Sequence, residues 1–152
     1  MNTTSASPLA ATPAALVSQF IADVFNQGDL AALERYIAPS YRYHSPSEEL
    51  VGIAALRTFI ADLRTAFPDM HVAVVDQVGD AHKVCTRVTL TGTHRGTFAS
   101  VPATQRAVKV DGVIISEVSA GRITREWELL DQLTMFQQLG LLPTEDATAS
   151  SK

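Results

Sequence analysis

The chain has 152 residues, 46% of them hydrophobic and 18% charged, a composition typical of one folded domain rather than of a disordered segment. Its formal net charge is −4 and no basic stripe runs along it, which argues against nucleic acid as a partner. No apolar run approaches the roughly 18 residues needed to span a membrane, and a single cysteine, Cys85, excludes an internal disulfide and a cysteine-built metal site.

The two ends of the chain differ in composition from its middle. Residues 1–12 are rich in Ser, Thr, Ala and Pro, and residues 144–152 are similarly polar, so we expect a disordered arm and a flexible tail around a single domain over residues 13–143. The first residues lack the cationic start and the apolar segment of a signal peptide. We therefore expect a cytoplasmic protein.

Apolar residues at helical spacing predict three helices in the first half of the chain. The first has Thr12 as its N-cap and Pro13 at its first position, and it ends at Gly28. The second covers residues 29–37, and the third covers residues 53–67 and stops at Pro68. A short extended segment at residues 40–45 lies between them.

After Pro68 the apolar period changes from helical to alternating, which predicts strands. They are expected at residues 70–78, 83–94, 106–119 and 122–131, followed by a helix at 132–139. Helices followed by an antiparallel meander predict an α+β fold, in which a cone-shaped, curved antiparallel sheet wraps around the three helices. The hollow between sheet and helices is the expected ligand site, and residues 95–105 form its rim or lid.

Strand alternation assigns two polar side chains to the buried face of the sheet. His94 shares a face with the apolar residues Val84, Val88 and Leu90, and Asp131 shares one with Ile123, Trp127 and Leu129. Glu126 and Glu128 point away on this pattern. A carboxylate on an apolar wall should have a raised pKa, which suits Asp131 to take up and return a proton. The alternative is that Asp131 only caps the last helix, and the two roles are compatible.

Other polar residues have a structural alternative beside the functional one. His94 could be a core histidine bonded to a backbone group, and His44 could be an exposed loop residue. Trp127 could be a core residue or one wall of an aromatic pocket, and Arg106 could bind an oxyanion or form a surface ion pair. His44, His94 and Asp131 could form a metal triad, but their local spacing does not require one. We expect no metal and no other cofactor.

Several motifs occur in a characteristic order along the chain. They are Tyr43-x-x-Pro46, Phe67-Pro68-Asp69-Met70, Gly92-Thr93-His94-x-Gly96-x-Phe98, Gly121-Arg122-Ile123-x-x-x-Trp127-Glu128-x-x-Asp131 and Gln138-Leu139-Gly140. In this order they resemble the SnoaL-like polyketide cyclases, or ester cyclases, of the nuclear transport factor 2-like fold. The resemblance extends over about residues 14–142. One departure is Gln105 before Arg106, where members commonly have glycine.

The resemblance implies a cofactor-independent intramolecular aldol closure of a polyketide ester. In that family an aspartate near the end of the last strand is the acid–base catalyst. The position that resembles it here is Asp131, with His94 as the second catalytic residue. The substrate-binding residues that we expect are His44, Trp127, Arg106, Tyr43 and Phe98.

We therefore expect an acid–base enzyme that acts on an apolar, carbonyl-containing small molecule in secondary metabolism. A hydrolase, isomerase or hydratase could use the same pocket carboxylate, and a non-catalytic ligand-binding or dimerisation module would need no such carboxylate. Val113, Ile115 and Cys85 lie on the outer face of the predicted sheet, which helices of a chain this short cannot also cover. We therefore expect a homodimer or homotetramer.

Overall fold

The computed structural model describes residues 11–143, so most of the expected arm and the whole of the expected tail lie outside the described residues. Within this range the chain has the α+β fold that the sequence predicts. The helices are α1 (Pro13–Phe20), α2 (Leu33–Tyr36), α3 (Ile53–Ala66) and α4 (Gln132–Gln138). The strands are β1 (Ile37–His44), β2 (Glu49–Val51), β3 (His71–Gly79), β4 (Lys83–Thr93), β5 (Ala107–Ser119) and β6 (Arg122–Leu130).

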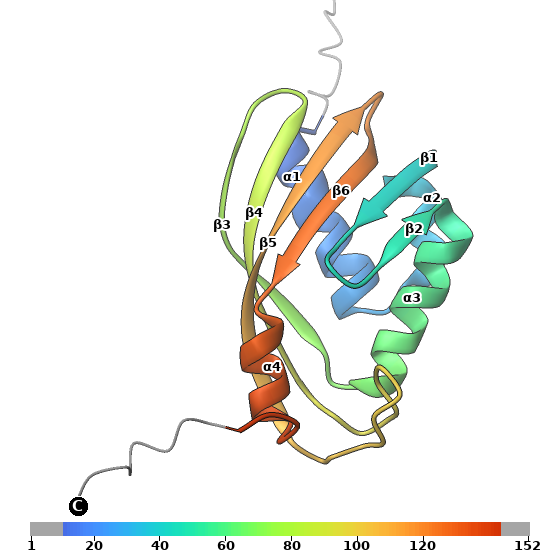
Figure 1. Cartoon of the computed structure of the whole chain (residues 1–152). Coiled ribbons are helices and arrows are strands. Elements are labelled where there is room, and N and C mark those ends of the chain that lie inside the picture. The colour runs from blue at the N-terminus through green and yellow to red at the C-terminus, as the bar shows by residue number, and fades with distance from the viewer. Residues whose placement is uncertain (1–10, 144–152) are drawn as a thin grey trace, which may run out of the picture.

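The strands form one curved, unclosed sheet in the order β2-β1-β6-β5-β4-β3 (Figure 1). The four strands from β3 to β6 pair antiparallel, as predicted. The sheet is nevertheless mixed rather than wholly antiparallel, because β1 pairs parallel with β6. Alternation along a strand does not reveal the direction of its neighbour, and β1 and β6 are far apart in the sequence.

The first helix begins as its sequence predicts. Pro13 is its first residue, and the Thr12 side chain accepts a hydrogen bond from the Ala15 N–H at 3.2 Å. The helix continues as a wider π-helical turn, Ile21–Asn26, and the chain leaves it at Gly28, whose φ of 75° is in the left-handed region that glycine favours.

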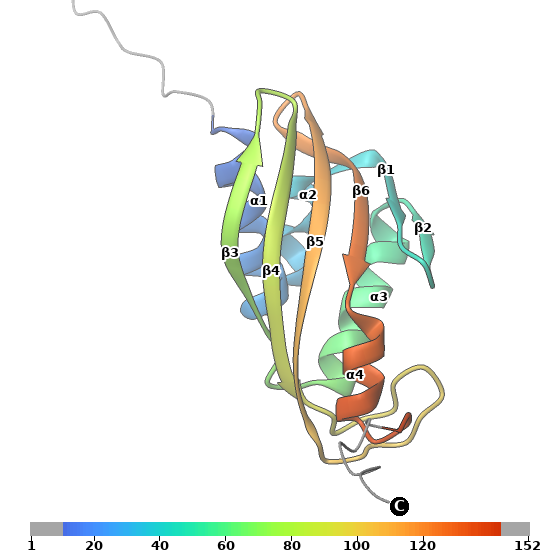
Figure 2. The ribbon, with the colours of Figure 1, turned by 60° about the vertical axis from the view of Figure 1, so that its left-hand side comes forward.

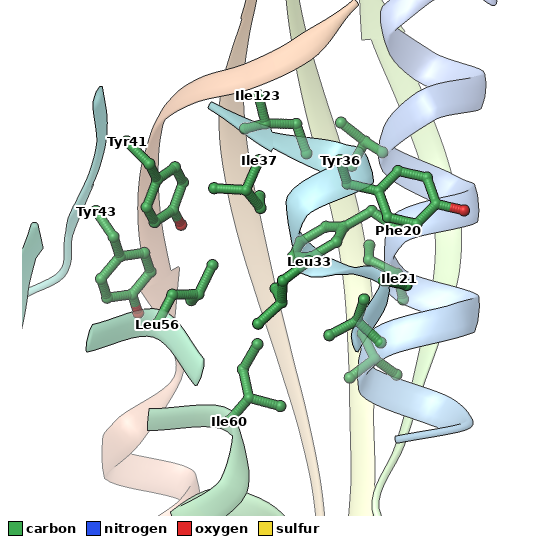
Figure 3. Close-up of a cluster of buried hydrophobic side chains, with 14 of the residues drawn as sticks. Phe20, Ile21, Leu33, Tyr36, Ile37, Tyr41, Tyr43, Leu56, Ile60 and Ile123 are labelled. Carbon is green, nitrogen blue, oxygen red and sulfur yellow. The ribbon is translucent and has the colours of Figure 1, made fainter. Parts of the chain in front are cut away.

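Helices α1, α2 and α3 all lie against one face of the sheet, and none of these three helices covers the opposite face (Figure 2). The core between them contains side chains that are at most 2% exposed, among them Phe20, Leu33, Ile37, Ile60 and Ile123 (Figure 3). Burial of each such side chain contributes about 1.5–3 kcal/mol, so this layer accounts for much of the stabilisation of the fold.

A β-bulge in β6 decides which of its side chains face the helices. Ile123 pairs with Val118 of β5, but Arg125 pairs with the preceding residue, Glu117, so Thr124 is an extra residue in β6. The alternation therefore reverses after Ile123. Glu126 is buried and faces inward, whereas Leu129 is 61% exposed. The predicted orientation of β6 beyond Ile123 is thus wrong.

Candidate functional site

A cavity of about 600 Å³ lies between the concave face of the sheet and the helices. This volume is in the range that small organic ligands occupy. Its wall is mostly apolar and includes Ile21, Phe25, Phe59, Leu63, Phe67, Met70, Val72, Val88, Leu90, Ile114, Leu130, Met135 and Phe136. The expected hollow is therefore present, and residues of the sheet, the π-helical turn after α1, α3, α4 and the 95–105 connection all contribute to it.

Glu128 provides the carboxyl group inside this cavity. It lies on the inward face of β6, two residues after Glu126, because of the bulge at Thr124. The pKa of Glu128 is raised to about 7. Burial is the main cause and the nearby carboxyl of Glu126 adds to it, whereas a hydrogen bond from Tyr43 lowers the pKa. A carboxyl with this pKa can accept and return a proton near neutral pH.

Tyr43 is the polar partner of Glu128 and also lines the cavity. It is 5% exposed on β1, and its ring packs against Phe59 with the centroids 5.7 Å apart. Its hydroxyl hydrogen-bonds with Glu128, and burial together with that carboxyl raises the pKa of Tyr43 well above its ordinary value. Tyr43 therefore stays a neutral phenol, which can donate a hydrogen bond to a ligand oxygen.

The other charged residues at the cavity are also acidic. Glu48 and Asp62 line it and are themselves exposed, which places them toward its mouth. Among the residues that the structure describes, no lysine, arginine or histidine lines the cavity. An anionic ligand would therefore meet three carboxyl groups and no compensating cation, so the site favours an uncharged ligand.

The connection 95–105 closes one side of the cavity, as expected for a lid. Four of its residues, Thr97–Ser100, line the cavity, and Phe98 among them was predicted from the sequence. Phe98 and Val101 exchange two backbone hydrogen bonds of 3.0 and 2.8 Å around Ala99 and Ser100, which both have positive φ. The lid is fastened to the end of α3, because the Ala66 carbonyl accepts hydrogen bonds from the N–H groups of Arg95 and Gly96.

Asp131 does not line the cavity. Its carboxylate caps α4 instead, since it accepts hydrogen bonds from the Thr134 N–H at 3.1 Å and the Thr134 hydroxyl at 2.7 Å. These bonds lower the pKa of Asp131, whereas the strand pattern predicted a raised pKa. The cap was the structural alternative to a catalytic role, and the bulge in β6 explains why alternation placed Asp131 on the wrong face.

His94 is fully buried at the end of β4, as predicted, but it does not line the cavity. Its Nδ1 accepts a hydrogen bond from the Thr104 N–H at 3.2 Å. Its ring stacks on Phe67 at 5.3 Å and meets the edge of Phe98 at 6.4 Å. His94 therefore supports the cavity wall from behind.

His44 and Trp127 lie together on the outer face of the sheet, away from the cavity. They are paired across β1 and β6, and both border a shallower surface hollow. His44 is bonded to Glu49 at 2.6 Å, and the cations of Arg125 and Lys83 lie over the Trp127 ring at 5.4 and 5.7 Å. Both residues were expected inside the pocket, and the same reversal in β6 accounts for the position of Trp127.

Arg106 also lies outside the cavity. Its guanidinium packs against Gly140 at the end of α4, where an added Cβ at position 140 would be 2.9 Å from Arg106 Cζ. A cation at this end of a helix is favourable because the last carbonyl groups carry partial negative charge. Of the seven predicted site residues, the structure places Tyr43 and Phe98 in the cavity wall.

The described residues contain neither a metal-binding cluster nor a membrane-spanning helix. His44, His94 and Asp131 bind different partners, and within residues 11–143 no group of three or more potential ligands could hold a metal ion. Over the same range, no helix has the length and apolar character that crossing a bilayer requires.

Glu128 is the residue that sequence reasoning missed. The usable signal is a matched spacing: Glu126 and Glu128 alternate on β6, as Tyr41 and Tyr43 alternate on β1. Two glutamates and two tyrosines at i, i+2 predict acid–hydroxyl pairs if their strands are neighbours and face the same way. That condition depends on the parallel β1–β6 pairing, which the sequence pattern does not indicate.

A protein-family model matches most of the sequence. Residues 15–139 match the family model of the SnoaL-like polyketide cyclases. No curated protein sequence matches the chain significantly. Among solved structures, IdmH from Streptomyces antibioticus, a proposed polyketide cyclase, is 32% identical; the match covers 86% of this chain and 99% of that one, with a TM-score of 0.74.

Two further structures are similar over most of their length. TsrD from Streptomyces laurentii is 28% identical, with 84% of this chain and 93% of that one covered and a TM-score of 0.76. AclR from Streptomyces galilaeus, a proposed hydroxylase, is 25% identical, with 88% of each chain covered and a TM-score of 0.77. The family match spans most of the sequence, and the chain belongs to the SnoaL-like polyketide cyclases of the nuclear transport factor 2-like fold.

Proposed function

We propose that this protein closes a ring in an uncharged, carbonyl-rich small molecule by acid–base catalysis, with Glu128 as the proton-transfer group. The observation that carries this proposal is a carboxyl group of pKa about 7 inside a largely apolar cavity of about 600 Å³. General acid–base groups work best when their pKa is close to the working pH. The family of the chain and the description of IdmH support ring closure as the reaction.

In the proposed reaction, the Glu128 carboxylate removes a proton from a carbon that lies between two carbonyl groups. The resulting enolate carbon attacks another carbonyl of the same molecule, so one carbon–carbon bond forms. The proton held by Glu128 then passes to the new alkoxide oxygen, and no other reactant is consumed. The Tyr43 hydroxyl, which neighbours Glu128, donates a hydrogen bond to the enolate oxygen.

Three lining residues support an apolar and uncharged substrate. Phe59 and Phe67 offer ring faces and edges to a flat, conjugated molecule, and Phe98 does so from the lid. Because no basic residue of the described range lines the cavity, a free acid would be bound less well than its ester. We accordingly propose an esterified rather than an anionic substrate.

The test compares Glu128→Gln with Asp131→Asn, a matched change of carboxylate to amide three residues away. Substrates would be sought by incubating the chain with carbonyl-rich esters and detecting products by mass spectrometry. Glu128→Gln should lower turnover on the order of 10²-fold or more while retaining ligand binding, since the amide cannot exchange a proton. Asp131→Asn should retain most activity, because an asparagine still caps α4.

The pH profile of the parent chain supplies a second readout of the same prediction. Because Glu128 must be ionised to act as the base, kcat/KM should rise as the pH increases through about 7. Full activity in Glu128→Gln, or a large loss confined to Asp131→Asn, would overturn the proposal and return the catalytic role to Asp131. Products of changed mass would point instead to a hydrolase or hydratase that uses the same carboxylate.

A further inference from the structure

A second glutamate lies directly behind the first on the inward face of β6. Glu126 is 5% exposed, and each of its carboxyl oxygens accepts a hydrogen bond of 2.7 Å, one from the Tyr41 hydroxyl and one from the Ser116 hydroxyl. Both hydroxyl-bearing residues are fully buried, and neither hydroxyl has another acceptor among the described residues. Burial raises the pKa of Glu126, and the hydrogen bonds from Ser116 and Tyr41 oppose that rise because they stabilise the ionised form.

Glu126 and Glu128 form two parallel pairs with tyrosines of β1. Tyr41 binds Glu126, and Tyr43, two residues later, binds Glu128. Figure 3 shows the two tyrosine rings next to each other, with their hydroxyl groups on the same side. Alternate residues of a strand are about 6.6 Å apart, a distance at which like charges in a protein interior repel measurably.

We propose that Glu126 is a positioning residue for the reaction: its buried negative charge, held by Tyr41 and Ser116, keeps Glu128 able to bind a proton at neutral pH. This inference rests on the proposed acid–base role of Glu128. Glu126 is then a second carboxyl group of the site, one that does not itself contact the substrate. Exposure decides which glutamate has which role, since Glu128 reaches the cavity and Glu126 is enclosed beneath it.

The groups around the pair leave Glu126 as the nearest negative charge in the interior. From β1 the facing titratable groups are Tyr41 and Tyr43, and β5 contributes the hydroxyl of Ser116. The remaining acids at the cavity, Glu48 and Asp62 of α3, are exposed to solvent, which screens them. The arginines of these two strands, Arg42 of β1 and Arg125 of β6, are exposed on the opposite face of the sheet.

The proposal is tested first on the unmodified, ligand-free chain. Carbon-13 labelling of the glutamate carboxyl groups lets NMR follow Glu126 and Glu128 separately during a pH titration. Glu128 should titrate near pH 7, and Glu126 should already be ionised over that range. A Glu126 carboxyl that stays protonated throughout the titration of Glu128 would overturn the inference, and this experiment needs no substitution.

Three variants then separate charge from structure. Glu126→Gln should lower the titration midpoint of Glu128 by on the order of one pH unit, since the like charge is removed. Glu126→Asp, which restores the charge, should return the midpoint toward that of the parent. Glu117→Gln removes a charge from the adjacent strand, where Glu117 pairs with Lys83 at 3.2 Å, and should leave the midpoint unchanged.

An unchanged midpoint in folded Glu126→Gln would contradict the inference, as would an equal shift in Glu117→Gln. If Glu126→Gln does not fold, the titration of the parent chain decides. These measurements use no substrate, so they can fail while Glu128→Gln still abolishes turnover. Conversely, an active Glu128→Gln would overturn the proposed function and leave the electrostatic coupling of the two glutamates intact.

Discussion

Glu128 destabilises the folded chain in the pH range in which it is proposed to work. Its ordinary pKa is 4.5, and burial raises it to about 7 in the folded protein. Below pH 4.5 the group is protonated whether or not the chain is folded, so it costs nothing. Between these two values the folded state binds more protons than the unfolded state. Stability should therefore fall as the pH rises through this window, and the full cost is present above it.

This cost predicts a gain in stability when the charge is removed. Glu128→Gln should raise the free energy of unfolding by up to about 3 kcal/mol at pH 8, and should change it little at pH 4. The amide oxygen can still accept the hydrogen bond of Tyr43. Urea unfolding at the two pH values measures the difference. A gain that is equal at both pH values would reflect packing and contradict the electrostatic explanation.

At the level of elements, the sequence predicts most boundaries but not every orientation. The helix caps at Thr12 and Asp131 and the four long strands follow from local patterns and are found within about one residue of their predicted limits. The site was harder to predict, because one extra residue, Thr124, exchanges the two faces of β6. That exchange brings Glu128 into the cavity and places Trp127 outside.

The attachment of the lid to α3 depends on one glycine. A Cβ at Gly96 would lie 2.5 Å from the Thr65 carbonyl oxygen, so Gly96→Ala must displace the lid from the backbone of α3. Amide hydrogens of residues 95–105 should then exchange on the order of tenfold faster or more, since the bonds to Ala66 open. Hydrogen–deuterium exchange followed by mass spectrometry measures this.

Ala99→Gly is the matched control in the same lid. Ala99 has a φ of 47°, a conformation that costs a non-glycine residue about 1 kcal/mol or more, so glycine should leave exchange in the lid unchanged or slower. If Gly96→Ala exchanges like the parent, the contact with α3 does not hold the lid. Substrate affinity should be lower in a variant whose lid amides exchange faster, because Phe98 of the lid lines the cavity.

On the scale of the whole molecule, the outer face of the sheet carries a row of side chains that α1, α2 and α3 do not cover (Figure 2). Cys85, Ile115, Trp127 and His44 are successive neighbours across β4, β5, β6 and β1. Ile115 is 36% exposed, and Leu129 beside this row is 61% exposed. All three N-terminal helices pack on the other face (Figure 2), so no described part of the chain covers this one. An apolar surface of this kind is typical of a protein interface.

We therefore predict that the chain self-associates through this row, most simply as a symmetric dimer in which the two outer faces meet. Ile115→Asp should shift the equilibrium toward a monomer near 16.3 kDa, because a carboxylate at the centre of the interface would be desolvated without a partner. Light scattering after size exclusion at micromolar concentration measures the mass. Thr58→Asp is the control, since Thr58 is exposed on α3, which packs on the opposite face of the sheet, and the mass of that variant should match the parent. A parent chain that is already monomeric, or an Ile115→Asp variant of unchanged mass, would show that this face is not an interface.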